Sequence, residues 1–201
     1  MKKITMKKII AVTGTPGTGK TTLSGRLARE LNAKVISLTD VVNENNLYTG
    51  IDLERDSKIV DVKKLGKFIE KLIKTKFSDE ETIILEGLLS HLICAHSKRT
   101  SGQDFMPVTH VIVLRASPSA LKQRLELRGY SKAKIRENIE AEFMGVCLNE
   151  SLWCENVIEV DSTGQVNLNL ITCWLKSGGR KIHEIDWTED FCGVLGEFTL
   201  H

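Results

Sequence analysis

The sequence lacks a long hydrophobic run. No apolar stretch in its 201 residues approaches the ~20 residues of a membrane-spanning helix, and none has the small-residue end of a secretory signal peptide. We therefore expect a cytoplasmic protein without membrane contacts. Its 41% hydrophobic and 27% charged residues are typical of a folded globular chain, and nothing in the composition marks a second domain.

A strong net charge is absent too. The formal net charge is +2 at pH 7, although Lys2, Lys3, Lys7 and Lys8 make the N-terminus locally positive. We interpret that cluster as a solvated chain end. Because a global basic field is missing, we predict no direct binding of nucleic acid.

Closely paired cysteines are also missing. The five cysteines are odd in number, widely spaced and free of any C-x-x-C pair: Cys94, Cys147, Cys154, Cys173 and Cys192. A zinc site needs closely paired ligands, and the five histidines are scattered as well. We therefore expect buried, reduced thiols and no zinc site.

What the sequence does contain is a complete phosphate-binding loop. Residues 14–21 match G-x-x-x-x-G-K-[ST] between an apolar run and a helical pattern. In such a loop, backbone N–H groups converge on the phosphates of ATP, Lys20 reaches the β/γ-phosphates and the Thr21 hydroxyl ligates Mg²⁺. An ordinary Gly-rich turn is the alternative, and the glycine spacing excludes a dinucleotide fingerprint. The predicted nucleotide-binding residues here are Gly17, Thr18, Gly19, Lys20, Thr21 and Thr22.

Short apolar runs alternate with helical patterns along the chain. The predicted strands are residues 8–13, 34–38, 82–85, 110–114 and 157–160. This alternation predicts an α/β fold, a three-layer P-loop NTPase domain whose five-stranded parallel sheet has helices on both faces. We expect one domain over residues 1–190 and a flexible C-terminal tail at 191–201.

Ligands of parallel sheets gather at the carboxyl ends of the strands, which selects Asp40, Glu86 and Arg115. Glu86 is placed to bind a metal or its waters, or else is a surface carboxylate. Asp40 opens a polar insertion at residues 39–56. That insertion suits a second-substrate site, and the alternative is a solvated loop in which Asp40 caps a helix.

Four arginines lie within 22 residues of one another: Arg115, Arg124, Arg128 and Arg136. Arginine suits phosphate because its planar fork donates two parallel hydrogen bonds and stays charged. Glutamates in the same stretch can pair with some of them, so we expect about half to be ion-pair partners. Arg124 and Arg128 are four residues apart and share a helix face. We predict that both bind the nucleotide.

Several motifs of the chain point to one family: residues 14–22, Leu47-Tyr48 with Asp52, Val113-Leu-Arg115, Arg124-Leu-Glu126 with Arg128-Gly-Tyr130, and Glu140-Ala-Glu142. In these motifs the chain resembles an archaeal version of the nuclear-type adenylate kinases, called adenylate kinase isoenzyme six or coilin-interacting nuclear ATPase in eukaryotes. The resemblance spans about residues 7–187. The phosphate loop alone is generic, whereas its combination with R-L-E-x-R-G-Y is specific.

The resemblance implies an adenylate-kinase-like fold with a monophosphate-binding arm at about residues 37–60 and a short lid at 127–137. Lys20, Glu86 and Arg128 are then the predicted catalytic residues, with Arg128 contacting ATP from the lid, and Asp40 and Arg55 are the predicted substrate-binding residues. The family is also linked to maturation of the small ribosomal subunit through a ribosomal protein partner. ATP hydrolysis accompanies its weak kinase activity.

Two departures from the family pattern bear on the acceptor site. The family usually has an acid, one residue and a histidine after the third strand, whereas Glu86, Gly87 and Leu88 stand here. The next histidine, His91, stands one helical turn further on. Ordinary adenylate kinases also carry an arginine shortly after this strand, and residues 88–95 contain none. We expect AMP recognition to depend on Arg55 or on backbone groups.

The expected function is that of a nucleoside monophosphate kinase, with Mg-ATP and AMP as substrates and two ADP as products. One alternative is an ATP-driven assembly switch that acts on a ribosomal protein, its kinase activity being incidental. Another is a kinase for a different small metabolite. The Arg-rich lid favours kinases in general, and the missing arginine after Glu86 favours the switch.

Overall fold

The computed structural model describes residues 7–53, 55, 57–95, 108–182 and 185–199. Its strands are β1 (Lys8–Thr13), β2 (Lys34–Ser37), β3 (Tyr48–Asp52), β4 (Ser57–Val60), β5 (Thr82–Glu86), β6 (His110–Arg115), β7 (Val157–Asp161) and β8 (Arg180–Lys181). Its helices are α1 (Lys20–Leu31), α2 (Leu38–Glu44), α3 (Val62–Lys76), α4 (Leu92–Ala95), α5 (Pro118–Glu126), α6 (Lys132–Phe143), α7 (Val146–Ser151), α8 (Leu168–Ser177) and α9 (Thr188–Thr199).

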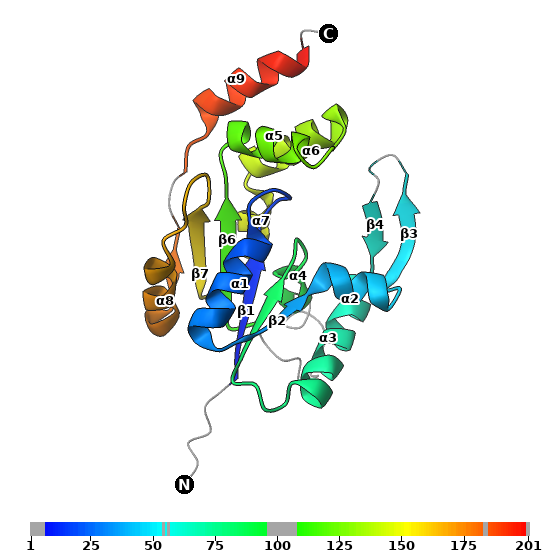
Figure 1. Ribbon diagram of the computed structural model, residues 1–201, viewed down its shortest axis with the longest axis vertical. Coiled ribbons are helices and arrows are strands. Elements are labelled where there is room, and N and C mark those ends of the chain that lie inside the picture. Colours follow the sequence, from blue (N-terminus) through cyan, green and yellow to red (C-terminus); the bar gives the residue numbers. More distant parts are fainter. Residues whose placement is uncertain (1–6, 54, 56, 96–107, 183–184, 200–201) are drawn as a thin grey trace.

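Six of the strands form one parallel sheet in the order β2-β5-β1-β6-β7-β8 (Figure 1). β1 pairs with β5 on one side and β6 on the other, so the phosphate loop leaves the sheet at its centre. The predicted α/β fold is confirmed, with six strands in place of the expected five. The additional strand, β8, has only two residues and therefore carries no readable hydrophobic pattern.

Alternate side chains of β1 enter two different cores. Ile9 and Ala11 face the core that α2, α3 and α7 cover. Ile10 and Val12 face the opposite core, which α1 and α8 cover. Because fully burying an aliphatic side chain stabilises a fold by about 1.5–3 kcal/mol, both layers hold the central strand, and with it the phosphate loop, in a fixed position.

A third apolar cluster lies outside the sheet and joins α5, α6 and α9. Val194 of α9 is buried in it, and the rings of Phe143 and Phe191 stack with their centroids 3.9 Å apart. The expectation of a flexible tail is therefore wrong for residues 191–199, which lie in α9. These contacts join segments about 50 residues apart, and a local sequence pattern does not reveal them.

The predicted arm consists of α2 and an antiparallel hairpin of β3 and β4. The Ser37 side chain accepts a hydrogen bond from the Asp40 backbone N–H and so caps α2. Asp61 caps α3 in the same way, with bonds from two backbone N–H groups. Figure 1 shows the hairpin projecting from the sheet beside α6.

The cysteines divide into two groups. Cys147 and Cys154 are buried, as expected, whereas Cys173 and Cys192 are exposed, which corrects the expectation for these two. Cys173 is exposed because α8 turns its neighbours Ile171 and Trp174 into the core; the Cys94 side chain lies outside the described part. Within the described ranges, no helix is long and apolar enough to cross a membrane.

Candidate active site

The phosphate loop joins β1 to α1 at the carboxyl edge of the sheet. Two of its glycines are required by the path of the chain. Gly14 has a φ of 141°, and a Cβ there would overlap the carbonyl oxygen of Leu114 on β6. Gly19 caps α1 in the left-handed conformation, with a φ of 86°. The loop thus curls over the N-terminus of α1, where free N–H groups and the helix dipole favour an anion.

Lys20 begins α1, and its ammonium group turns back over the loop. Nζ donates hydrogen bonds to the carbonyl oxygens of Gly14 and Thr15, both at 2.9 Å. Burial is the main cause that lowers the pKa of Lys20; the charge of Arg128 acts in the same direction, and that of Glu86 acts against it. An ammonium group with little water around it interacts strongly with a phosphate group.

Thr21 and Glu86, the two predicted metal ligands, lie side by side. The Thr21 hydroxyl donates to Glu86 Oε1 at 3.2 Å. Glu86 ends β5 and is only 8% exposed. Within the described residues, no group of three or more His, Cys, Asp or Glu could hold a metal by itself. Two oxygen donors instead suit Mg²⁺, which keeps waters and binds through substrate phosphates.

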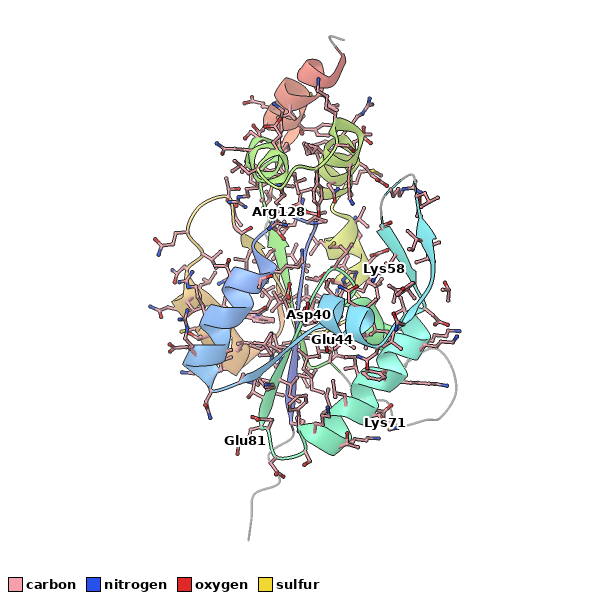
Figure 2. All side chains as sticks on the ribbon, turned by 45° about the vertical axis from the view of Figure 1, so that its right-hand side comes forward. Asp40, Glu44, Lys58, Lys71, Glu81 and Arg128 are labelled. Atoms are coloured by element: carbon pink, nitrogen blue, oxygen red, sulfur yellow. The ribbon has the colours of Figure 1, made fainter. Side chains whose placement is uncertain are left out.

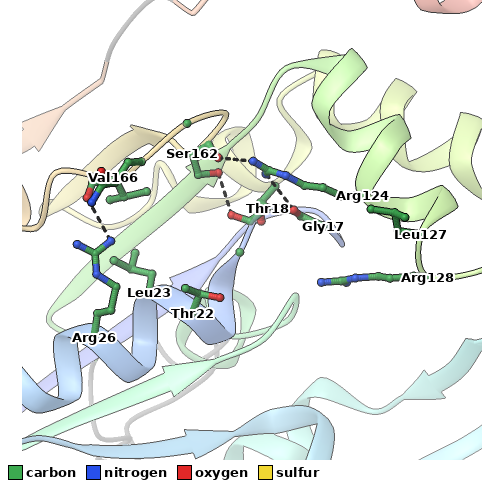
Figure 3. A pocket seen from close by; sticks show the side chains of 13 residues that line it. Gly17, Thr18, Thr22, Leu23, Arg26, Arg124, Leu127, Arg128, Ser162 and Val166 are labelled. Carbon is green, nitrogen blue, oxygen red and sulfur yellow. Dashed lines mark hydrogen bonds between the residues drawn. The ribbon is translucent and has the colours of Figure 1, made fainter.

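The phosphate loop lines two cavities. One of them, the lid-side cavity, has a volume of about 530 Å³ (Figure 3). Residues of the phosphate loop and α1, of the end of α5 and of the loop after β7 line it. Six of the eight predicted nucleotide-binding residues are among them: Gly17, Thr18, Gly19, Thr22, Arg124 and Arg128. The other two, Lys20 and Thr21, lie at the start of α1.

Arg124 and Arg128 play different parts in this cavity. The Arg124 guanidinium donates to the carbonyl oxygens of Gly17 at 3.2 Å and of Ser162 and Thr163 at 2.8 Å. It therefore ties α5 to the phosphate loop and to the loop after β7. Figure 3 shows the Arg128 side chain extending from the turn after α5 toward the phosphate loop, where it adds a positive charge near Lys20.

The second cavity, the arm-side cavity, has a volume of about 420 Å³ and lies on the other side of the loop. Thr15 and Pro16 of the loop line it, together with Arg55 and Ser57 of the arm. Its remaining walls come from residues 88–92, α6 and α7. The phosphate loop is thus a wall shared by two cavities that otherwise use different segments of the chain.

Arg55 lines the arm-side cavity and bonds to two carboxylates. Its Nε donates to Glu137 Oε1 of α6 at 2.7 Å, and Nη1 donates to Asp52 Oδ2 of β3 at 3.2 Å. The Arg55 side chain is 59% exposed and the Glu137 side chain 50%. The two acceptors lie on different elements, so this arginine links the arm to α6.

His91 is buried against the arm-side cavity. Its Nδ1 lies 2.7 Å from the Thr13 hydroxyl, and its Nε2 lies 3.0 Å from Glu150 Oε2. Burial lowers the pKa of His91, and the bond to Glu150 opposes that shift. Leu88, at the position of the family histidine, lines the same cavity and is 43% exposed. The two side chains therefore differ in role: His91 braces the end of β1, and Leu88 forms the cavity surface.

Arg115 is part of a buried ionic cluster and lines neither cavity. Its guanidinium donates to Glu142 Oε1 at 2.6 Å and to Glu159 Oε1 at 2.5 Å. Glu142 also accepts a hydrogen bond from the Thr15 hydroxyl at 2.5 Å. Arg115 is therefore one of the arginines that pair with glutamates rather than bind the nucleotide. The cluster holds α6 against the phosphate loop. Arg136 is another such arginine, since it pairs with Glu140 on the surface of α6.

Asp40 is exposed on the first turn of α2 and lines neither cavity, although the strand-end rule selects it. Figure 2 shows Asp40 on α2, below Arg128 in that view. The cause is the immediate helix start at Ser37, which turns Asp40 outward. Sequence reasoning gave no individual role to Thr15, Glu142 or Glu150, because their partners lie far away along the chain. Thr15 and Glu142 entered it only as members of family motifs.

Comparison with known proteins agrees with this geometry. The chain is 40% identical over 189 residues to a protein of Methanocaldococcus jannaschii named "Putative adenylate kinase", covering 92% of this chain and 96% of that protein. A protein of the same name from Pyrococcus furiosus is 43% identical over 195 residues, covering 93% and 95%. The AAA domain family matches residues 10–145.

The chain belongs to this archaeal family of P-loop proteins. It is a phosphotransferase, as the sequence predicts. Among solved structures, a "putative kinase" from Chloroflexus aurantiacus has a TM-score of 0.54 at 20% identity, over 87% of this chain and 97% of that one. At that identity the likeness shows the fold alone.

Proposed function

We propose that the chain transfers the γ-phosphoryl group of Mg-ATP to a nucleoside monophosphate, AMP before others, so that ATP and AMP give two ADP. The observation that carries this proposal is the pair of cavities on the two sides of one phosphate loop. A γ-phosphoryl group held by that loop would face an acceptor in the arm-side cavity. Direct transfer needs this in-line placement of donor and acceptor oxygens.

Each predicted catalytic residue has a part in the transfer. Lys20 and Arg128 would neutralise the charge that spreads over the γ-phosphoryl oxygens. Thr21 and Glu86 would hold Mg²⁺, which when bound neutralises charge on the β- and γ-phosphates. Closure of residues 127–137 over ATP would exclude water, so that the monophosphate rather than solvent accepts the phosphoryl group.

The acceptor would bind in the arm-side cavity through cations and apolar walls. Arg55 and Lys134 both line it and can meet the anionic phosphate of a monophosphate. Leu88, Leu89 and Leu92 line it as well and can pack against a flat base. The name shared by the archaeal relatives supports AMP as the acceptor.

A second candidate function is an ATP-driven switch that helps a small-subunit ribosomal protein assemble. The leucines after β5 favour it, because they stand where ordinary adenylate kinases carry an arginine. In that case ATP would be hydrolysed without an acceptor, and kinase activity would be incidental. The third candidate, a kinase for another small metabolite, predicts turnover with a different acceptor.

One assay separates the three. ADP formation and inorganic phosphate release are measured side by side, with and without each nucleoside monophosphate. The proposed kinase gives ADP without free phosphate, and AMP is the best acceptor. Phosphate release that no monophosphate changes would contradict it and support the switch. Failure of all monophosphates, combined with low phosphate release, would point to another acceptor.

A further inference from the structure

The helix α3 carries an unusual density of positive charge. Six exposed lysines lie within its 15 residues: Lys63, Lys64, Lys67, Lys71, Lys74 and Lys76. The helix has a single acid, Glu70, whose carboxylate pairs with Lys74 at 2.6 Å. The chain as a whole has a net charge of only +2. The net charge of the whole chain therefore gives no indication of the strongly basic surface of α3.

Four of these lysines form a stripe along one side of the helix. Lys63, Lys67, Lys71 and Lys74 follow the spacing i, i+4, i+8 and i+11, which keeps side chains on one helix face. The opposite face, with Leu65, is buried in the core. Figure 2 shows Lys71 on the outer side of α3, away from the site at which Arg128 lies.

The dimensions of the stripe suit a chain of phosphates. At a rise of ~1.5 Å per residue, its first and last lysines are ~16 Å apart along the helix. One strand of a nucleic acid duplex advances ~3.4 Å per phosphate, so the stripe spans about five phosphates. The acids Asp79, Glu80 and Glu81 follow α3 in the sequence and bound the stripe at that end.

The composition of the stripe favours a phosphodiester backbone over a protein partner. Protein interfaces are depleted of lysine and depend on buried aromatic or apolar anchors. The exposed side chains of α3 are its six lysines and Thr75, and five of the lysines lie on one side of the helix. None of the exposed side chains is aromatic. Lysines supply point charges that meet phosphates but do not read bases.

We propose that α3 is a binding surface for nucleic acid, which it holds through the phosphodiester backbone and without sequence preference. This surface lies outside both cavities, so it stands or falls independently of the proposed function. It also reverses the expectation drawn from net charge, because binding depends on the local arrangement of cations rather than on their sum.

Fluorescence anisotropy with the full chain tests this surface. The probes are labelled single-stranded RNA and DNA of the same sequence, about 20 nucleotides long, titrated at several salt concentrations. Substituting Lys63→Gln, Lys67→Gln and Lys71→Gln together should weaken binding about 10²-fold at 0.1 M salt and reduce the slope of log K against log salt by about 2. Glutamine is a good helix former, so the fold should persist. A thermal melt equal to that of the unaltered protein confirms that it does.

The matched control substitutes three exposed cations on other helices, Arg29→Gln, Lys132→Gln and Lys176→Gln, with the same change in net charge. It should leave RNA and DNA binding nearly unchanged. Equal weakening by the control set, or no binding by the unaltered protein at 50 mM salt, would overturn the proposal. So would a poly-glutamate peptide that binds the same lysines as tightly as RNA, since that outcome points to an acidic protein partner.

Discussion

The two cavities beside the phosphate loop are built in different ways. The lid-side cavity is fixed by the backbone, because three carbonyl oxygens hold the Arg124 guanidinium. The arm-side cavity depends on Arg55, which two carboxylates on different elements hold. A carbonyl oxygen cannot move independently of the fold, whereas an exposed ion pair is weak and exchanges readily. The lid side of the loop is therefore preorganised, and the arm side can adjust to its ligand.

The largest effect should come from the wall that the two cavities share. Lys20→Ala removes the ammonium group that meets the γ-phosphoryl group from the loop, so we expect turnover to fall at least about 10³-fold. The fold should persist, since Lys20 is not a core side chain. Activity and a thermal melt check both points, with Lys176→Ala on the surface of α8 as the control. Near-normal turnover of Lys20→Ala would show that the loop takes no part in phosphoryl transfer.

Glu86→Gln should have the next largest effect. The amide keeps the size of the side chain but loses the charge next to Thr21, so kcat should fall on the order of 10²- to 10³-fold. ATP affinity should change much less, because the carboxylate acts mainly as charge develops. Calorimetry and steady-state rates separate the two. If turnover stays equal to that of the surface variant Glu44→Gln, Glu86 is no more than a strand-end acid.

Substitutions of Arg128 test the role of the lid-side cavity separately from that of the arm-side cavity. Arg128→Ala should reduce kcat roughly 10²-fold with a smaller change in ATP affinity, because the phosphate loop already binds ATP while the lid is open. Arg128→Lys should recover only part of the loss, since an ammonium group lacks the bidentate fork. Arg136→Ala, on the surface of α6, is the control. Wild-type rates for both Arg128 variants with AMP present would show that the lid assignment is wrong.

The smallest effect should appear on the arm side. Glu137→Gln weakens the hold on Arg55, so an acceptor phosphate no longer competes with that carboxylate. The KM for the monophosphate should fall about two- to fivefold, the scale of an exposed ion pair, with kcat and the KM for ATP unchanged. Glu140→Gln removes the same charge from the same helix but pairs with Arg136. An equal fall in that control would attribute the effect to overall charge.

The sequence predicts the lid-side cavity better than the arm-side cavity for a physical reason. The phosphate loop, Arg124 and Arg128 belong to local motifs, and the strands around them repeat a clear apolar pattern. The arm-side cavity joins Thr15, Arg55 and Glu150 from segments far apart, and only tertiary packing brings these together. The same reason explains α9, whose Phe191 and Val194 are held by α5 and α6. The wrong placement of Asp40 has a related cause, since a rule based on strand ends takes no account of where the next helix begins.

The most direct test of the two-cavity account is calorimetric titration with two adenosines joined through five phosphates. Such a ligand should place one nucleoside in each cavity, with its phosphates across the shared loop. We expect one molecule per chain and binding on the order of 10²-fold tighter than that of ATP, because the second half binds at high effective concentration. Arg55→Ala and Arg128→Ala should each weaken it. Two molecules per chain, or an affinity no better than that of ATP, would show that the two cavities do not bind donor and acceptor across the shared loop.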